Sequence, residues 1–257
     1  MKVSICMITY NHENYIVKAI NSVLSQETNF NYELIISNDC SNDKTHSIIV
    51  NLINNHPKSK FIKYINHKEN IGMMKNFIST LKTCKGKYIA LCDGDDYWID
   101  NNKIQMQVDY LDNHFDFNIV YTLNKILLKN KLVDNKIKPI NNKVTKVKNV
   151  IDGNFIPASS VMFRNIIDKI KFSSWIYESP YGDWPLYIFL TQKGEKIKCL
   201  HFQSLVYRKN IGVISNMKQS NISILQSDYN MFSNMLNDKN LVNVHKLIER
   251  KLYALEI

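Results

Sequence analysis

The chain has 257 residues, of which 45% are hydrophobic, and this is enough to bury the core of one large domain without disulfide or metal staples. The formal net charge is +10, but the excess lysines gather in one stretch that contains no arginine and no aromatic residue, so nucleic acid is not the expected partner. No run of about 18 uncharged apolar residues occurs and the N-terminus becomes polar too early for a signal peptide, so we expect a soluble protein.

The cysteines show no CxxC pair and no regular spacing. Three of them lie inside apolar runs that predict strands. We therefore expect reduced thiols and a cytoplasmic location, either free or peripheral to the inner face of the membrane. The five residues are Cys6, Cys40, Cys84, Cys92 and Cys199.

The first 120 residues alternate between strand-like and helix-like patterns. Short β-rich or continuous apolar runs predict strands, and apolar residues repeated every three or four positions predict helices between them. The predicted strands are 2–9 (KVSICMIT), 32–37 (YELIIS), 61–65 (FIKYI), 87–92 (KYIALC) and 117–123 (FNIVYTL). The predicted helices are 14–24, a segment around 48–53, a segment that Asn70 caps and Gly86 ends, and a segment around 104–111.

Polar residues follow three of these strands. Repeated β-α units imply a largely parallel sheet, whose ligands gather at the carboxyl ends of the strands. Neither GxGxxG nor GxxxxGK[ST] can be written anywhere in the sequence, so a nucleotide bound here would need a metal to hold its diphosphate. The residues at this edge are Thr9, Tyr10, Asn11, Asn38, Asp39, Cys40, Ser41, Asn42, Asp43, Asp93, Gly94, Asp95 and Asp96.

The segment ALCDGDDYWID concentrates four carboxylates behind a strand. In an extended chain Asp93 and Asp95 project to the same side, and Gly94 leaves room for a ligand to approach the backbone. A turn that caps the next helix is the alternative. For Asp93 and Asp95 we favour a metal site, whereas for Asp96 and Asp100 both interpretations stay open.

Several blocks in the correct order resemble a family 2 inverting glycosyltransferase of the GT-A fold, in the bacterial group with a DxDDxW motif. The blocks are VSICMITYNHENYIVKAINSVLSQ, ELIISNDCSND, NHKENIGMMKNF and GKYIALCDGDDYWIDNNKIQMQVDYL. The resemblance implies an α/β GT-A fold with a mostly parallel sheet flanked by helices and a C-terminal helical extension. It covers residues 1 to about 215, with a nucleotide-sugar-binding half (1–120) and an acceptor-binding half (121–215), and leaves 216–257 as the extension.

The resemblance also implies roles for single residues in donor binding. Asp95 would coordinate Mn²⁺ or Mg²⁺ between the two phosphates, and Asp93 would lie near the ribose and the metal. Asp39 would accept a hydrogen bond from the base. The family usually has a glycine where this chain has Cys40, so tolerance of a positive φ is lost there. The other implied donor contacts are Thr9, Tyr10, Asn11, Asn70 and Arg208.

Asp183 in the segment YESPYGDWPLYIFLTQKGEKIKCL matches the position of the family's catalytic base. An inverting transfer needs one base to take the proton of the acceptor hydroxyl. The alternative is a helix N-cap, because tryptophan and proline follow Asp183 and Gly194 would end the helix. Glu178 is the reserve candidate. In YRKNIGV, Asn210 stands where the family has a histidine, which makes a further metal or phosphate contact there doubtful.

We therefore expect transfer of a sugar from a nucleotide-diphosphate sugar, most simply a UDP-sugar, to a glycan or lipid-linked acceptor in cell-surface polysaccharide synthesis. Two alternatives are a non-catalytic nucleotide- or glycan-binding module of the same fold, which Asn210 favours, and a nucleotidyltransferase. The latter usually carries a glycine-rich basic loop near its first strand, and ITYNHENY has none. Donor and acceptor depend on loop shape, which motifs do not fix.

Two further segments concern partners. Between Asn124 and Asn149 there are eight lysines and a single acidic residue, Asp134, which indicates a solvated loop or, alternatively, a surface for an anionic membrane or acceptor. Beyond residue 215, apolar residues at helical spacing predict a pair of helices joined at NDKN, packed on the catalytic domain or forming a homodimer.

Overall fold

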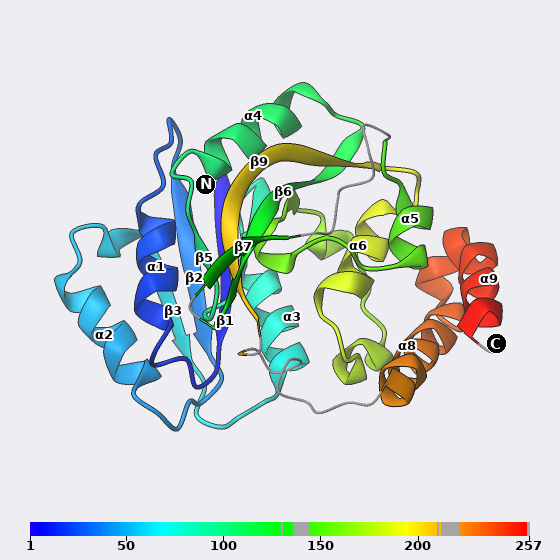
Figure 1. Cartoon of the computed structure of the whole chain (residues 1–257), viewed down its shortest axis with the longest axis horizontal. Helices are drawn as coiled ribbons and strands as arrows, with labels where there is room; N and C mark the ends of the chain where they lie inside the picture. The colour runs from blue at the N-terminus through cyan, green and yellow to red at the C-terminus, as the bar shows by residue number, and fades with distance from the viewer. Residues whose placement is uncertain (130, 136–143, 210, 212–220, 256–257) are drawn as a thin grey trace.

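The computed structural model describes residues 1–129, 131–135, 144–209, 211 and 221–255. Within these residues nine strands form one sheet in the order β3-β2-β1-β4-β8-β6-β9-β5, and β7 pairs with β6. Helices cover both faces of the parallel strands, with α1 and α2 on one side and α3 on the other (Figure 1). The expected α/β architecture with a helix-flanked sheet and a C-terminal helical segment is confirmed.

The first half of the sheet is parallel, as expected from the repeated β-α units. Strands β3, β2, β1 and β4 pair side by side in the same direction. The strands are β1 (Val3–Thr9), β2 (Tyr32–Asn38), β3 (Ile62–Asn66) and β4 (Tyr88–Leu91). The helices are α1 (Ile16–Leu24), α2 (Thr45–Asn55), α3 (Met73–Thr83) and α4 (Lys103–Asn113).

Alternation along β1 explains how this half is buried on both faces. Val3, Ile5 and Met7 are fully buried and belong to the hydrophobic cluster under α1 and α4. Cys6 points to the opposite face and packs in the cluster that contains α3. Successive side chains of a strand point to opposite faces, so a strand covered on both sides is apolar throughout.

The second half of the sheet mixes directions. Strand β8 runs antiparallel to β4 and β6, whereas β9 runs parallel to β6. Register shifts around Leu123 bend this long pair, and the end of β9 reaches β5. The strands are β5 (Tyr97–Trp98), β6 (Phe117–Leu128), β7 (Lys131–Asp134), β8 (Met162–Arg164) and β9 (Lys196–Arg208). The helices are α5 (Val147–Asp152) and α6 (Asp183–Thr191), with 3₁₀ turns at Ser59–Phe61, Ala158–Ser160, Ile167–Lys169, Ser174–Glu178 and Lys239–Val244.

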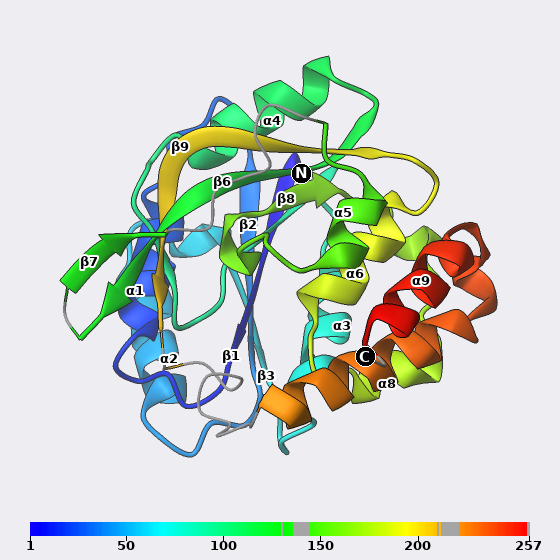
Figure 2. The same ribbon diagram turned by 45° about the vertical axis from the view of Figure 1, so that its right-hand side comes forward.

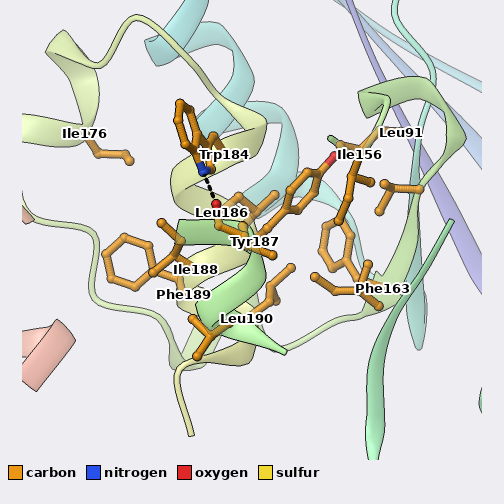
Figure 3. Close-up of a cluster of buried hydrophobic side chains, with 14 of the residues drawn as sticks. Leu91, Ile156, Phe163, Ile176, Trp184, Leu186, Tyr187, Ile188, Phe189 and Leu190 are labelled. Carbon is orange, nitrogen blue, oxygen red and sulfur yellow. Dashed lines mark hydrogen bonds between the residues drawn. The ribbon is translucent and has the colours of Figure 1, made fainter. Parts of the chain in front are cut away.

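Helix α6 is buried on all sides. Its residues from Trp184 to Thr191 are all buried, and the Trp184 indole N–H donates to the Val150 carbonyl at 2.7 Å (Figure 3). Helices α8 (Asn221–Leu236) and α9 (His245–Leu255) cover it, with the Phe232 ring edge-on to Trp184 at 5.3 Å. The two C-terminal helices therefore pack on the body of the same chain. The division of the chain at residue 215 and a homodimer through these helices stay predictions.

Three helix boundaries differ from the predictions. Gly72 (φ 88), and not Asn70, occupies the N-cap of α3. That helix ends at Thr83, three residues before Gly86, which lies so close to the backbone of β1 that an added Cβ would come within 2.5 Å of the Ser4 nitrogen. Helix α6 ends at Thr191, and Gly194 (φ 100) follows in the next turn. In the part of the chain that the structure describes, no helix is both long and apolar enough to cross a bilayer.

Candidate active site

Three carboxylates lie together where β4 ends. The carboxylate oxygens of Asp93, Asp95 and Asp96 come within 4.8 Å of one another, and we call these residues the aspartate cluster. Burial and the carboxylates of Asp95 and Asp183 raise the pKa of Asp93 to about 7. Burial, Asp95 and Asp93 likewise raise the pKa of Asp96 well above its ordinary value. A cation or a proton relieves repulsion of this kind, so the cluster is suited to metal binding.

The two aspartates whose interpretation stayed open have different surroundings. Asp96 belongs to the cluster and is 4% exposed. Asp100 instead accepts the backbone N–H of Asn102 at 2.8 Å, in the turn that leads into α4. The turn interpretation therefore holds for Asp100, and Asp96 joins the predicted metal pair.

Arg208 reaches the cluster from the end of β9. Its backbone N–H donates to the Asp96 carboxylate at 3.0 Å, and its guanidinium donates to the Asp95 carbonyl. The guanidinium carbon also lies 4.7 Å from the ring centre of Tyr97 and 5.0 Å from that of Tyr15. These contacts hold one positive charge beside the buried carboxylates, and the contact of Arg208 with a diphosphate stays a prediction. Asn210, two residues later, lies outside the described residues.

Gly94 packs against the loop that follows β1. A Cβ at this position would lie 2.7 Å from the Thr9 hydroxyl oxygen and 2.9 Å from Nδ1 of His12, so no side chain fits. The expectation that Gly94 leaves room for a ligand is therefore wrong, since protein atoms fill that space. His12, which the sequence did not single out, lies 3.1 Å from the Thr9 hydroxyl. Burial lowers the pKa of His12, although Asp95 and Asp43 act in the opposite direction.

Asp39 ties the loop after β2 to the start of α3. Its two carboxylate oxygens accept the backbone N–H groups of Ile71 at 2.8 Å and Gly72 at 3.0 Å. The Asn70 side chain donates to the Asp39 carbonyl at 3.3 Å. Each carboxylate oxygen has a second lone pair, so these bonds leave acceptor capacity for a ligand.

Two residues in the neighbouring loops have left-handed backbone conformations. Asn11 has φ 56 and Cys40 has φ 57, so Cys40 adopts the conformation for which glycine is suited. The Asn11 side chain accepts the N–H of Asn42 at 2.8 Å, and the Asn11 N–H donates to Ser41 at 2.9 Å. Thr9 is buried and Tyr10 is half-buried between these loops and β1. The predicted nucleoside-binding residues thus form one continuous rim.

Asp183 faces the same edge of the sheet from α6. Gly182 occupies the N-cap position and Asp183 is the first residue of the helix. The alternative interpretation, in which Asp183 is the N-cap residue, is therefore wrong by one position. Its carboxylate accepts the side-chain N–H of Asn154 at 2.9 Å and the backbone N–H of Trp184 at 2.8 Å. Burial raises the pKa of Asp183 despite these bonds. Its charge contributes to the raised pKa of Asp93, whereas Glu178 is exposed at the end of a 3₁₀ turn.

Lys103 and Trp98 support the loop of the aspartate cluster, which the sequence did not indicate. Lys103 is fully buried, donates to Gln107 at 2.8 Å and lies 4.2 Å from the ring centre of Trp98. Burial lowers the pKa of Lys103 to about 7. The Trp98 indole donates to the carbonyl of Ser159, whose hydroxyl accepts the N–H of Asp93. This chain of contacts fixes the loop that carries the aspartates.

Comparison with known proteins gives relatives over much of the chain. Residues 4–171 match the family model described as Glycosyl transferase family 2. The Escherichia coli UDP-Glc:alpha-D-GlcNAc-diphosphoundecaprenol beta-1,3-glucosyltransferase WfgD is 30% identical over 217 residues, 84% of this chain and 80% of that protein. The Uncharacterized protein Rv1520 of Mycobacterium tuberculosis is 35% identical over 162 residues, 63% of this chain. The match spans 46% of that relative, so about half its length.

Solved structures show the same fold at lower identity. S. aureus TarS 1-349 in complex with UDP-GlcNAc has a TM-score of 0.71 and 19% identity, and the match covers 100% of this chain and 72% of TarS. The mannosyltransferase PcManGT from Pyrobaculum calidifontis, in complex with GDP-Man and Mn²⁺, has a TM-score of 0.70 and 14% identity, with coverage of 100% and 70%. On the family match and this architecture, the chain belongs to glycosyltransferase family 2 and has the GT-A fold.

Proposed function

We propose that this chain is a metal-dependent inverting glycosyltransferase. It moves a sugar from a nucleotide-diphosphate sugar, with a UDP-sugar as the first candidate donor, to a hydroxyl of a glycan or lipid-linked acceptor. The observation that carries the proposal is the meeting of the aspartate cluster, Asp183 and Arg208 at one edge of the sheet. The family supports sugar transfer as the reaction class. The names of the E. coli relatives WfgD and WfaP support a lipid-linked acceptor, which suits cell-surface polysaccharide synthesis at the inner face of the membrane.

A divalent ion fits the aspartate cluster by the chemistry of its donors. Mg²⁺ and Mn²⁺ prefer carboxylate oxygens, and the raised pKa values of Asp93 and Asp96 mark uncompensated negative charge. Asp95 and Asp93 would hold the ion, and Asp96 offers one further oxygen beside the one that accepts from Arg208. When bound, the ion would neutralise the departing diphosphate.

The rim of loops next to the cluster would bind the nucleoside. Thr9, Tyr10 and Asn11 would contact base and ribose, and Asp39 would use its remaining lone pairs for the base N–H. Asn70 would contribute from the same loop. Arg208 is held in place by two aromatic rings, and its remaining N–H donors would pair with the diphosphate.

Asp183 would act as the base. As the acceptor hydroxyl oxygen attacks the anomeric carbon, the hydroxyl proton passes to the Asp183 carboxylate. The bond from the anomeric carbon to the diphosphate oxygen breaks, and both of its electrons go to the diphosphate. Attack from the face opposite the leaving group inverts the configuration. Burial raises the pKa of Asp183, which strengthens it as a base, while the bonds from Asn154 and Trp184 keep it oriented.

The proposal is tested with a panel of nucleotide sugars and Mn²⁺, followed by release of the free nucleotide. We expect one donor to be hydrolysed slowly without acceptor, and faster transfer when a short-chain GlcNAc diphosphate lipid is added. An α-linked donor should give a β-linked product by NMR. Nucleotide binding without any release or transfer across the panel would instead favour a non-catalytic binding module.

A further inference from the structure

The end of β6 and the whole of β7 form a two-stranded hairpin that leaves the body of the molecule. We call residues 125–129 and 131–134 the β6–β7 hairpin. Its cross-strand pairs run from Lys125 with Asp134 to Leu128 with Lys131, and Lys129 has a left-handed φ of 46 in the turn. Figure 2 shows β7 projecting beyond the other strands. Every residue of β7 is exposed, so neither face of this strand is covered by the described part of the chain.

Each face of the hairpin carries exposed apolar side chains beside charged ones. Leu132 is 54% exposed, Val133 is 45% exposed and Leu128 is 37% exposed. Leu132 and Val133 are neighbours in a strand, so they point to opposite faces of the hairpin. Exposed apolar side chains on both faces of a projecting strand are suited to contact with another apolar phase. A partner that contacts only one face would leave the other in water, whereas a lipid interface surrounds both.

The charge at the same end is positive. Lys129 and Lys131 flank the turn, and the carboxylate of Asp134 lies at the opposite end of the hairpin, beside Lys125. Among the described residues, no carboxylate forms an ion pair with Lys129 or Lys131. Apolar side chains next to lysines are suited to the interface of a bilayer that contains anionic lipids.

The hairpin is joined directly to the candidate active site. Along its other edge β6 pairs with β9, which places Leu127 beside Arg208, and Arg208 contacts Asp95 and Asp96. A bilayer held at the turn of the hairpin would therefore lie on the side of the sheet where Arg208 meets the aspartates. A hydroxyl on a membrane-bound lipid diphosphate would need to approach from such a surface.

We propose that the β6–β7 hairpin inserts its turn and apolar side chains into the head-group region of an anionic bilayer and so brings the active site to a lipid-linked acceptor. The second part rests on the proposed function, whereas bilayer binding itself does not. The exposed apolar residues Ile222 and Leu225 at the start of α8 are one competing surface, but the described α8 sequence contains no lysine or arginine. An anionic bilayer therefore favours the hairpin over α8.

The test measures co-sedimentation with vesicles of phosphatidylcholine alone and with vesicles in which about a third of the lipid is phosphatidylglycerol. We expect the wild-type chain to bind only the anionic vesicles. Leu132→Asn with Val133→Asn, and separately Lys129→Glu with Lys131→Glu, should each weaken the partition by roughly tenfold or more, because each pair removes one of the two attractions. The far-UV circular dichroism spectrum and the melting temperature should be unchanged, which shows that the variants are folded.

Matched controls separate the hairpin from other surfaces. Ile222→Asn with Leu225→Asn removes exposed apolar area from α8, and Lys82→Glu with Lys85→Glu reverses two exposed lysines near the end of α3. Both should bind vesicles as the wild type does. Failure of the wild type to bind, equal weakening by the lysine control, or loss only in the α8 variant would overturn the proposal. Concentration-dependent dimerisation that the hairpin variants abolish, without vesicle binding, would assign the surface to a second copy of the chain.

Activity then distinguishes this inference from the proposed function. The hairpin variants should transfer normally to a short-chain acceptor in solution and lose at least about tenfold with the same acceptor chemistry in anionic vesicles. Vesicle binding without any transfer by the wild type would contradict the proposed function but not the bilayer surface. Equal transfer by wild type and variants in vesicles would remove the link between the hairpin and the acceptor.

Discussion

The carboxylates at the two ends of the parallel strands have opposite electrostatic surroundings. At the carboxyl ends, the aspartate cluster gathers like charges, and the pKa values of Asp93 and Asp96 are raised. At the amino ends, Asp112 accepts from Lys2 at 2.5 Å, from Lys87 at 2.6 Å and from the Tyr88 hydroxyl at 2.6 Å. Burial alone would raise the pKa of Asp112, but these three donors hold it well below its usual range.

The two ends also differ in backbone conformation and in how their polar groups are paired. The left-handed residues Asn11 and Cys40 both lie in loops at the carboxyl ends. The amino ends instead have Arg164, whose guanidinium donates to the carbonyl of Leu111 and to the Tyr88 hydroxyl. Strained and repelling groups thus gather where a ligand can compensate them, and compensated groups lie at the far end. We infer that one end of the sheet stabilises the fold while the other is suited to binding and chemistry.

The largest expected effect is on sugar transfer. If Asp183 is the base, Asp183→Asn should lower the transfer rate by about 10²- to 10⁴-fold, because the amide cannot take a proton. UDP binding and the melting temperature should stay near wild-type values, since an amide oxygen can still accept one of the two hydrogen bonds that Asp183 receives. A near wild-type rate, or a product with retained configuration, would contradict this role.

The next effect concerns metal binding. Asp95→Asn should weaken Mn²⁺-dependent UDP binding at least tenfold, which corresponds to about 1.4 kcal/mol, because it removes one charged oxygen donor from the aspartate cluster. Calorimetry with UDP in Mn²⁺ and in EDTA measures it. Without metal, the same variant should be as stable as the wild type or more so, since one repelling charge is gone. Equal UDP affinity of the wild type in both buffers would exclude metal dependence.

Neutralising Asp112 at the opposite end should have the reverse effect on stability. Asp112→Asn should lower the free energy of unfolding by about 1–2 kcal/mol, because it breaks two partly exposed ion pairs and weakens the bond from buried Tyr88. Asp109→Asn on the exposed face of the same helix is the matched control and should stay within about 0.5 kcal/mol of wild type. Urea unfolding of both variants measures the difference.

The sequence predicted the first four strands and the polar residues that follow them better than the rest of the molecule, because periodic patterns and strand ends are local signals. The runs KVSICMIT, YELIIS, FIKYI and KYIALC became β1 to β4, and the polar residues after them meet along one edge. The spacing of Asp93 and Asp95 predicts that their side chains lie on the same side, and in the structure their carboxylates lie together. Asp96 stayed open because its contact with Arg208 joins residues 112 positions apart, which no local pattern encodes.

In the second half of the sheet the sequence predicted only the first part of β6, as the strand 117–123, and the other strands were missed for physical reasons. Strand β9 has a mixed burial pattern because it bends and changes partners, and β5 has only two residues. Asn154 was missed because its partner Asp183 lies 29 positions away, whereas His12 contacts the nearby Thr9 but belongs to no motif that the sequence pattern marks. In the sequence Lys103 resembles an ordinary solvent-exposed helix lysine, because no local pattern shows that the Trp98 ring covers its side chain.

A smaller effect is the pH dependence that Asp112 produces. Its pKa is lower in the folded state than in the unfolded chain, so its stabilisation is fully present above the unfolded value near 4 and is lost as pH falls through the folded value. The difference in unfolding free energy between wild type and Asp112→Asn should therefore be constant from about pH 6 to 8 and should shrink below about pH 4. A difference that stays constant into acid would mean that Asp112 is not held by its lysines.

The smallest expected effect tests backbone strain at the carboxyl ends. Cys40 has φ 57, a conformation that costs a residue with a Cβ about 1–2 kcal/mol, whereas glycine pays about 0.5–1 kcal/mol of unfolded-state entropy. Cys40→Gly should therefore raise the free energy of unfolding by about 0.5 kcal/mol, after loss of the weak contact from Sγ to the Lys68 carbonyl at 3.5 Å. Cys40→Ala keeps the Cβ and loses the same contact, so it should give no gain. If both variants shifted stability equally, the thiol and not the backbone would be the cause, and the contrast between the two ends would rest on charge alone.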